Sequence, residues 1–531
     1  MSRSMIQICS VLKESIWNTL SFYNHVIVSK VQNKNRKWII STAIALSFAY
    51  FIRSRVFYPP KRFRHLPHTS TFQMILSVLR KDSIFEYNRK HVQPLFEKND
   101  TRGLYTRLGP TGWEVYVSNL EDAKQVLFKL DTFPKTDEFK ESKDTLGNKF
   151  SVGQNIFIAN GHEWKKQRSI ANSAFHRSMP IIMFGELVET LFRTMELMDD
   201  TIEVTSLLRR YTLDAIGKAA FGFDFHATED PNSQWVVCYD AINVAFQDPL
   251  FLLFPILEQK FLWMFPKRKA IHDQLDLFLE MMDDIILNKR KEIQADKKHQ
   301  NEAEKDLLTL MIEAEQRGEG VMTNKVLKGN LCFFFLAGHD TTTNALSFAL
   351  YFLAVYPDVQ ERARKEVLTI LGEDRIPTFE QIKAMTYLTQ VIKETLRLYP
   401  PAPRIFPRYA QEDIALSGCM IPKGTHVIVD LHGLQRDENV WKDADRFNPD
   451  RFSEENDALT KNATWIPFST GGRQCLGMNF SLTEQRVVLS MLLRKYEWSL
   501  PKESPHRDHV LTAGTFLVGP KDLDITFKKR Y

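Results

Sequence analysis

The stretch FSTGGRQCLG, at residues 468–477, decides the fold, and its centre is a single cysteine. Two glycines precede Cys475 and Gly477 follows it, so the chain can turn tightly enough for backbone N–H groups to point at the sulfur. A helical pattern begins near Met478, which would bring the positive end of a helix dipole close to the same atom. Both features stabilise the thiolate form of a cysteine. The loop therefore predicts a thiolate suited either to nucleophilic catalysis or to axial ligation of iron.

Ligation of an iron porphyrin also requires apolar walls and cations for the two propionates. Phe468 and Arg473 supply one of each within the same loop. The alternative is a buried structural cysteine, the commoner role for an isolated cysteine. Here the pattern Phe-x-x-Gly-x-Arg-x-Cys-x-Gly is specified at five positions, and a chance match is a poor explanation for it.

Residues 331–352, LCFFFLAGHDTTTNALSFALYF, predict a helix about 33 Å long. The segment resembles a membrane span, but the polar residues 339–344 occupy its middle, where a bilayer disfavours them most. We therefore expect a helix that crosses a protein core beside a polar site. Gly338 leaves room for another group to approach the backbone. The alternative is a core helix whose threonines bond to its own carbonyl groups.

Further motifs accompany these two in a fixed order along residues 164–477: the WKKQR segment with Trp164 and Arg168, the KETLR segment with Glu394 and Arg397, and FNPDRF at 447–452 with Arg451. With these motifs and AGHDTT at 337–342, the sequence resembles the cytochrome P-450 superfamily of haem-thiolate monooxygenases. The Glu-x-x-Arg pattern alone is weak, because Glu361 and Arg364 repeat it without matching neighbours. The order of the motifs carries the resemblance.

The resemblance implies how individual residues bind haem b and act on dioxygen. Cys475 is implied as the axial ligand of the iron. The other implied cofactor-binding residues are Trp164, Arg168, Arg408 and Arg473 at the propionates, and Ala337, Gly338, Phe468 and Gly477 around the ring. Thr341 is implied to hydrogen-bond dioxygen, and Asp340 to relay protons from solvent. The implied structural network beneath the cysteine loop consists of Glu394, Arg397 and Arg451.

Positions that resemble the substrate pocket of the family are mostly apolar: Phe333, Phe334, Ala402, Ile405, Phe406, Thr512, Thr515 and part of the segment 140–160. They favour a lipophilic substrate such as a steroid, a fatty acid or a xenobiotic, into which one oxygen atom is inserted. Two alternatives stay open: an isomerase or dehydratase that uses the haem without dioxygen, and a haem-binding sensor without turnover. Retention of Asp340 and Thr341 counts against the isomerase.

The composition limits the possible partners. A formal net charge of +5 over 531 residues is too small to indicate nucleic acid as the main partner. Five scattered cysteines without a CxxC pair exclude a disulfide framework and a clustered zinc site. No flavin or nicotinamide fingerprint occurs, so electrons must come from a separate protein. The resemblance implies NADPH-cytochrome P-450 reductase, with cytochrome b5 as a second donor, and Lys165 and Lys166 as candidate contacts.

The amino terminus predicts a membrane anchor. Residues 38–52 are uncharged, and the run reaches residue 58 if Arg53 and Arg55 extend to the interface. The alternatives are a buried helix and a signal peptide, although no cleavage site follows. We expect an extension at 1–36, amphipathic or disordered, a transmembrane anchor at 37–58, a basic hinge at 59–68 and one catalytic domain at 69–531. The resemblance implies a fungal microsomal enzyme in the endoplasmic reticulum membrane, single-pass, with its catalytic domain in the cytosol.

The body of the chain predicts a mainly α fold with small β-sheets, the cytochrome P-450 fold. Apolar residues recur at helical spacing over 273–289, 358–371 and 482–496. Strand-like runs are short and few, at 113–117, 425–430 and 523–527. No linker or repeat separates independent domains.

Overall fold

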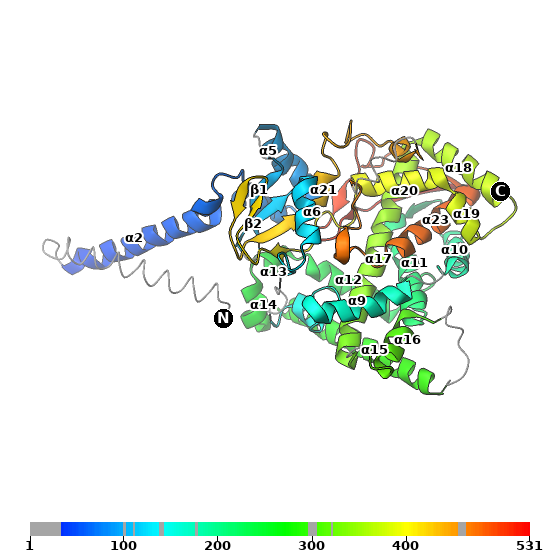
Figure 1. Ribbon diagram of the computed structural model, residues 1–531, viewed down its shortest axis with the longest axis horizontal. Helices are drawn as coiled ribbons and strands as arrows, with labels where there is room; N and C mark the ends of the chain where they lie inside the picture. The colour runs from blue at the N-terminus through cyan, green and yellow to red at the C-terminus, as the bar shows by residue number, and fades with distance from the viewer. Residues whose placement is uncertain are drawn as a thin grey trace.

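The computed structural model describes residues 33–98, 102–109, 112–136, 143–175, 179–295, 305–319, 322–454 and 464–530. The extension predicted for residues 1–36 lies outside these ranges, except that residues 33–36 begin the first described helix. Helices dominate the described part, and its strands form small sheets (Figure 1). The predicted mainly α class with small sheets is confirmed.

The longer helices are α2 (Asn33–Ile52), α3 (Thr71–Leu79), α6 (Leu120–Phe128), α9 (Gly161–Phe175), α10 (Ile181–Met195), α11 (Val204–Ile216), α12 (Gln234–Phe246), α15 (Pro266–Ala295), α16 (Leu307–Gln316), α17 (Asn324–Val355), α18 (Pro357–Leu371), α20 (Thr386–Leu398) and α23 (Met478–Lys495). The shorter ones are α4 (Ile84–Tyr87), α5 (Gln93–Lys98), α8 (Leu146–Ser151), α13 (Pro249–Leu253), α14 (Pro255–Phe261), α19 (Phe379–Ala384) and α21 (Leu431–Leu434). All three helices predicted for the body are present: α18 and α23 agree with their apolar patterns to within a few residues, and α15 extends beyond its pattern at both ends.

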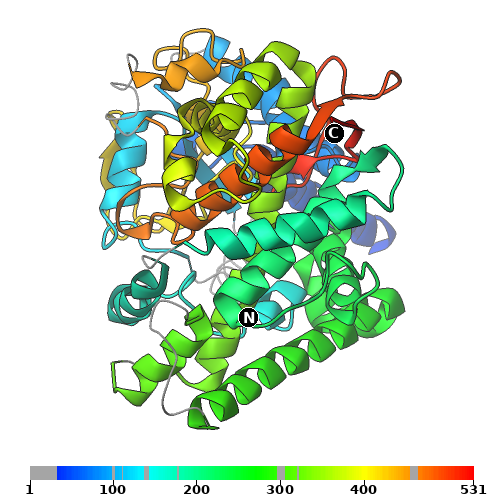
Figure 2. The ribbon, with the colours of Figure 1, turned by 90° about the vertical axis from the view of Figure 1, so that its right-hand side faces the viewer.

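Helix α17 forms the axis of the molecule. Its N-cap is Thr323, whose side chain accepts a hydrogen bond from the Val326 N–H, and its 32 residues extend about 48 Å. Helices α11, α15, α20 and α23 pack against it. Figure 2 shows α15 along one edge of the molecule and α23 crossing the opposite half. The predicted core helix is confirmed, with additional turns at both ends.

Four small sheets lie beside the helices. Strands β1 (Leu104–Gly109), β2 (Gly112–Val117), β7 (His426–Val429) and β4 (Arg408–Tyr409) form one sheet in the order β1-β2-β7-β4. The other strands are β3 (Thr201–Glu203), β8 (Tyr496–Ser499) and β11 (Asp524–Lys529) in a second sheet, β9 (Thr512–Ala513) with β10 (Gly519–Pro520), and β5 (Ile414–Leu416) with β6 (Cys419–Ile421). The three predicted strands correspond to β2, β7 and β11.

Two main hydrophobic clusters fill the interior. The larger surrounds α17 and draws buried side chains from positions as distant as Ile84 and Phe527. The smaller lies between the four-stranded sheet and α6, where Val115, Val427 and Leu127 are fully buried. The β2–β7 pairing is parallel, with Val115 opposite Val427. This pairing places β2, from the first quarter of the chain, beside β7, which follows α20.

The transmembrane helix predicted for residues 37–58 is not supported. Helix α2 ends at Ile52, and a π-helical turn, η1, follows at Arg53–Phe57. Figure 1 shows α2 projecting from the body on the side of β1 and β2. Among the described residues, no helix is both long enough and apolar enough to cross a membrane. The physical reason is the short uncharged run, which covers residues 38–52, whereas a span needs about 20 apolar residues.

Candidate active site

A cavity of about 310 Å³ lies between α17 and the loop that carries Cys475. Its remaining walls come from residues 156–157, the start of α9, the segment after α20 and the turn between β9 and β10. The lining includes most of the residues singled out in the sequence: Trp164, Arg168, Phe333, Phe334, Ala337, Gly338, Thr341, Ala402, Ile405, Phe406, Arg408, Phe468, Arg473, Cys475 and Gly477.

The cysteine loop folds tightly, as its glycines predict. Gly471 has a φ of 73°, a conformation that favours glycine, and the Cys475 N–H donates to the Phe468 carbonyl at 2.9 Å. Helix α23 begins at Met478, directly after the loop. Burial raises the pKa of the Cys475 thiol, whereas the Gly477 N–H and the charge of Arg168 lower it. The donors that favour a thiolate are therefore in place around a sulfur that lines the cavity.

Four of the five cations that line the cavity form one group: Lys135, Arg168, Arg408 and Arg473. Burial lowers the pKa of Arg473 to about 9, with smaller contributions from Arg408 and Arg168. Burial also lowers the pKa of Arg408 to about 10. The Nε atoms of the three arginines are buried and have no hydrogen-bond partner among the described residues. Desolvated cations that repel one another require anions, and a ligand with two carboxylates fits this arrangement.

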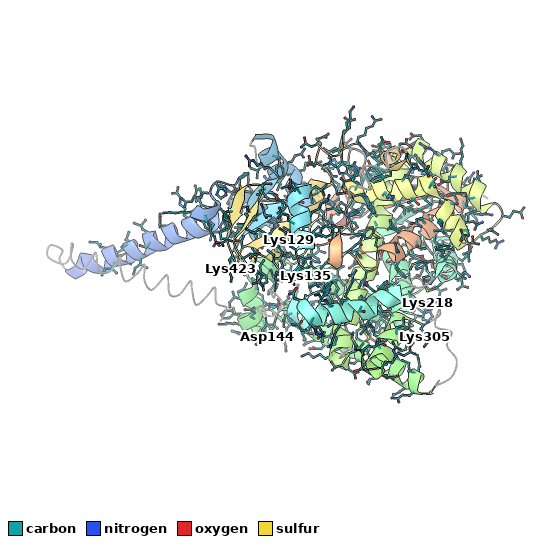
Figure 3. The ribbon with its side chains drawn as sticks, viewed as in Figure 1. Lys129, Lys135, Asp144, Lys218, Lys305 and Lys423 are labelled. Carbon is teal, nitrogen blue, oxygen red and sulfur yellow. The ribbon has the colours of Figure 1, made fainter. Side chains whose placement is uncertain are left out.

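Lys135 was not predicted from the sequence. Burial lowers its pKa well below the usual value, and the charges of Arg408, Arg473 and Arg168 lower it further. Its Nζ donates to the Phe157 carbonyl at 2.5 Å and lies 3.7 Å from the Phe157 ring centre. Figure 3 labels it between the four-stranded sheet and α9. No motif marks this position, because Lys135 is one lysine among many, and only its burial identifies it.

Arg473 and Trp164 contact each other directly, as expected for residues that serve one ligand. The Arg473 guanidinium lies 3.9 Å from the centre of the Trp164 ring. Its Nη2 donates to the Ala159 carbonyl at 2.6 Å. Arg408 Nη1 donates to the Phe133 carbonyl at 3.0 Å, which fixes that side chain at the cavity wall.

One face of α17 borders the cavity. Ala337, Gly338, Thr341, Thr342 and Ala345 line it, a spacing of three and four residues that places them on one side of a helix. The Thr341 hydroxyl donates to the Ala337 carbonyl at 2.8 Å, which is the internal bond anticipated for a core threonine. A Cβ at Gly338 would lie 2.6 Å from Cγ1 of Ile216. The glycine thus allows α11 to approach the α17 backbone closely.

Asp340 lies outside the cavity lining, on a neighbouring face of α17. It is 4% exposed and accepts a hydrogen bond from the Tyr239 hydroxyl at 2.6 Å. Its other oxygen lies 3.5 Å from Nε of Arg209, and Arg209 Nη1 lies 3.4 Å from the largely exposed carboxylate of Asp240. Asp340, the residue next to Thr341, is therefore connected to the protein surface through Arg209 and Asp240. Tyr239 and Arg209 carry no sequence motif and were not predicted.

The centre of the network beneath the cysteine loop is fully buried. Glu394 and Arg397 are both 0% exposed and form two hydrogen bonds, at 2.7 and 2.9 Å. Arg451 Nε donates to the same carboxylate at 3.2 Å. Arg397 also donates to the carbonyl of Gln435, whose amide donates to the Thr464 carbonyl. These contacts connect α20 to the segment that enters the cysteine loop.

The predicted pocket residues divide into two groups. Phe333 stacks on Phe157 with ring centres 3.9 Å apart, and Phe406 packs edge-on to Phe157 at 5.0 Å. Thr512 and Thr515, in contrast, are absent from the cavity lining, so their role as pocket residues stays a prediction. Thr512 is buried and shares a hydrogen bond with Ser83 at 2.5 Å. The turn between β9 and β10 presents its apolar residues, Phe516 and Leu517, to the cavity instead.

The donor set fits a porphyrin better than a bare metal ion. Across the described residues, no group of three or more His, Cys, Asp or Glu side chains is arranged to hold a metal ion. A single cysteine, four cations and aromatic walls instead match a flat apolar ring that carries two carboxylates and brings its own equatorial ligands.

Comparison with known proteins agrees with this arrangement. A family model described as cytochrome P-450 matches residues 86–527. Cytochrome P-450 3A12 of Canis lupus familiaris is 31% identical over 382 residues, which cover 68% of this chain and 73% of that protein. Cytochrome P-450 3A5 of Homo sapiens is 30% identical over 386 residues, 69% of this chain and 75% of that protein. The protein LUTEIN DEFICIENT 5, chloroplastic, of Arabidopsis thaliana is 28% identical over 457 residues, 82% of this chain and 74% of that protein.

Proposed function

The chain belongs to the cytochrome P-450 family, and we propose that this haem enzyme inserts one atom of dioxygen into a lipophilic substrate. The observation that carries the proposal is a single cavity lined by Cys475, by four cations and by Thr341. Haem, when bound, supplies an iron centre that activates dioxygen. The balanced reaction consumes the substrate, one dioxygen, two electrons and two protons, and yields the hydroxylated product and water.

Different residues around the cavity are proposed to bind different parts of the cofactor. Cys475 would provide the thiolate that holds the iron. Lys135, Arg168, Arg408 and Arg473 would provide charge-assisted hydrogen bonds to the two propionates, and Phe468 is part of the apolar wall. The buried Glu394–Arg397–Arg451 network supports the loop from below.

Proton delivery is the part of the reaction that the polypeptide performs. Asp340 holds its carboxylate between Arg209 and Tyr239, and Arg209 also pairs with Asp240 at the surface. Arg209 keeps its own protons, so its part is to hold Asp340 beside a polar path from the surface, along which solvent can protonate the carboxylate. Thr341, the next residue, presents its hydroxyl to the cavity, where rotation away from the Ala337 carbonyl lets it donate to an acceptor. The apolar walls exclude bulk water, so protons enter by this route.

Electrons have to enter from a separate protein, and we include NADPH-cytochrome P-450 reductase, with cytochrome b5 as a second donor, in the proposal. Helix α9 supports this choice, because Lys165 and Lys166 are exposed on the helix that carries Trp164 and Arg168 into the cavity. A basic surface at this place suits an acidic partner.

Association with the endoplasmic reticulum membrane also belongs to the proposal. Exposed apolar side chains on α2, such as Trp38, Leu46 and Tyr50, support it. A cytosolic catalytic domain and a fungal origin remain predictions from the family resemblance.

Replacement of the axial ligand tests the proposed function. Purified wild-type protein, reduced and exposed to carbon monoxide, should show the red-shifted Soret band of thiolate ligation. Cys475→Ser should lose that band, because a serine hydroxyl does not supply the thiolate. Cys419→Ser is the matched control, since Cys419 lies in β6 and outside the cavity lining, and it should keep the band. An unchanged band in Cys475→Ser would refute the assignment.

Labelled dioxygen separates the monooxygenase from the isomerase and sensor alternatives. With reductase, NADPH and a lipophilic substrate that shifts the Soret band, the product should carry one labelled oxygen atom. Product without label would indicate the isomerase, and absence of NADPH-dependent turnover the sensor.

A further inference from the structure

The cavity contains a fifth cation, Arg404, which stands apart from the other four. Lys135, Arg168, Arg408 and Arg473 influence the pKa values of one another, whereas Arg404 does not enter that group. Among the described residues that line the cavity there is no aspartate or glutamate. The thiolate and two propionates balance at most three of the five positive charges. With haem bound, positive charge in the cavity would therefore remain without a negative partner. Arg404 is the cation that does not belong to the interacting group.

Contacts fix the Arg404 side chain but do not neutralise it. Its backbone forms a β-bridge with Asp430, which sets the side chain in the cavity wall. Nη2 donates to the Thr515 carbonyl at 3.3 Å, and Nη1 lies 3.5 Å from the Tyr116 hydroxyl. A guanidinium has five N–H groups, and these two long contacts are its hydrogen bonds within the described chain. Arg404 has no ion-pair partner among the described residues, and it is only partly buried.

The nearest carboxylates are occupied by other groups. Glu114 accepts a hydrogen bond from Tyr116 at 3.0 Å, and Tyr116 in turn accepts one from Arg107 at 2.6 Å. Burial raises the pKa of Glu114, although Arg107 and Arg404 lower it. Burial thus makes Glu114 less acidic, and Arg107, which is buried and absent from the cavity lining, lowers its pKa more than Arg404 does.

We propose that Arg404 binds the carboxylate of the substrate, and that the substrate is a lipophilic acid with an apolar body. This proposal rests on the proposed function and specifies the substrate class of the same site. Apolar residues flank Arg404 on the cavity wall, with Ala402 and Ile405 on its own segment and Phe516 and Leu517 on the adjoining turn. A guanidinium with unused donors at an apolar surface favours an anionic head over a neutral one, because charge-assisted bonds are about twice as strong as neutral ones.

A matched pair of ligands tests the proposal on the haem-loaded protein. Dodecanoate and dodecan-1-ol share their alkyl chain and differ in charge, and each is titrated while the Soret difference spectrum reports Kd. In wild type, dodecanoate should bind more tightly than the alcohol. Arg404→Gln should weaken dodecanoate binding by about 10- to 100-fold, as expected for loss of a hydrogen bond to a charged group, and change the alcohol by less than about twofold. Arg404→Lys should recover part of the loss, because it keeps the charge.

Arg375→Gln serves as the control for loss of one positive charge, since Arg375 is exposed and does not line the cavity. It should leave both Kd values unchanged. Equal weakening of both ligands by Arg404→Gln, or of neither, would overturn the proposal, as would a wild type that does not prefer the acid. Loss of haem from Arg404→Gln would assign Arg404 to a propionate and overturn it too. In each of these cases an intact carbon monoxide band in wild type leaves the proposed monooxygenase standing.

Discussion

At the scale of single residues, the contacts of a side chain separate neighbours that look alike in the sequence. Thr341 and Asp340 are adjacent in one motif, yet Thr341 lines the cavity and Asp340 faces Tyr239 and Arg209 on another side of the helix. The helical rotation of about 100° per residue produces this separation. One residue can thus act inside the cavity while the next reaches toward solvent.

Asp340→Asn should lower kcat by about 10²- to 10⁴-fold, the usual range for loss of a general acid–base group. Its solvent deuterium isotope effect should rise, because proton delivery becomes slower. Both are measured under saturating substrate. Asp358→Asn, which removes an exposed carboxylate at the start of α18, provides the comparison and should leave both values unchanged. An isotope effect in Asp340→Asn equal to that of wild type would contradict the proposed route.

Glu484 is a second residue whose surroundings change its chemistry, here the pKa of its carboxyl group. It is 0% exposed, neither carboxyl oxygen has a hydrogen-bond partner among the described residues, and burial raises its pKa well above the usual value. The native state therefore keeps a proton that the unfolded chain releases above pH about 4.3. Native stability from this group is fully present below that pH and is lost as the pH rises toward the folded-state pKa.

Glu484→Gln removes this dependence. At pH 8 the free energy of unfolding of the variant, measured by urea denaturation, should exceed that of wild type by more than about 1 kcal/mol. The difference should shrink toward pH 4. Glu497→Gln, at an exposed position on β8, should match wild type at both pH values. Parallel pH profiles for wild type and Glu484→Gln would show that Glu484 is ionised in the native state.

At the scale of elements, two helices carry the same Glu-x-x-Arg pattern in different surroundings. In α20 both partners are fully buried, and Arg451 adds a second guanidinium to the carboxylate. In α18 Arg364 is buried and donates to the carbonyls of Leu493 and Tyr496, but its partner Glu361 is half exposed. The α18 pair is thus a half-exposed ion pair whose arginine also binds backbone carbonyls.

Matched substitutions should separate the two pairs. Glu394→Gln leaves two buried arginines without their carboxylate, so the free energy of unfolding should fall by about 3–5 kcal/mol. Glu361→Gln should cost less than about 1 kcal/mol, because an exposed carboxylate contributes little. Urea unfolding followed by tryptophan fluorescence measures both. Similar losses in the two variants would mean that burial does not distinguish these pairs.

At the scale of the whole molecule, the site brings together residues from a sheet, a helix and a loop that are far apart in the sequence. Lys135 and Arg408 come from the region of the four-stranded sheet, Arg168 from α9 and Cys475 from the loop before α23. Their positive charges oppose one another until anions bind among them. Cofactor binding and folding are therefore expected to be coupled.

Lys135→Met should have opposite effects on the two forms of the protein. In the apoprotein it removes a buried, repelled cation, so the melting temperature should rise. In the haem-loaded protein it removes a partner of a propionate, so haem should transfer faster to an acceptor such as apomyoglobin. Arg375→Met, on the surface, is the control and should change neither value. A lower melting temperature in the Lys135→Met apoprotein would contradict the predicted repulsion.

The sequence by itself determined the mainly α class, the long core helix and the residues of the cysteine loop, because periodicity and close-range motifs depend on neighbours in the chain. It also placed Glu394, Arg397 and Arg451 in one set through the order of motifs. The membrane span that it predicted is not supported among the described residues, because the uncharged run ends before Arg53 and Arg55. Only the tertiary structure decided that Lys135 and Arg404 line the cavity, that Thr512 does not, and that Tyr239 and Arg209 hold Asp340. The physical reason is that burial and opposing charge arise between segments far apart in sequence, and neither leaves a pattern along the chain.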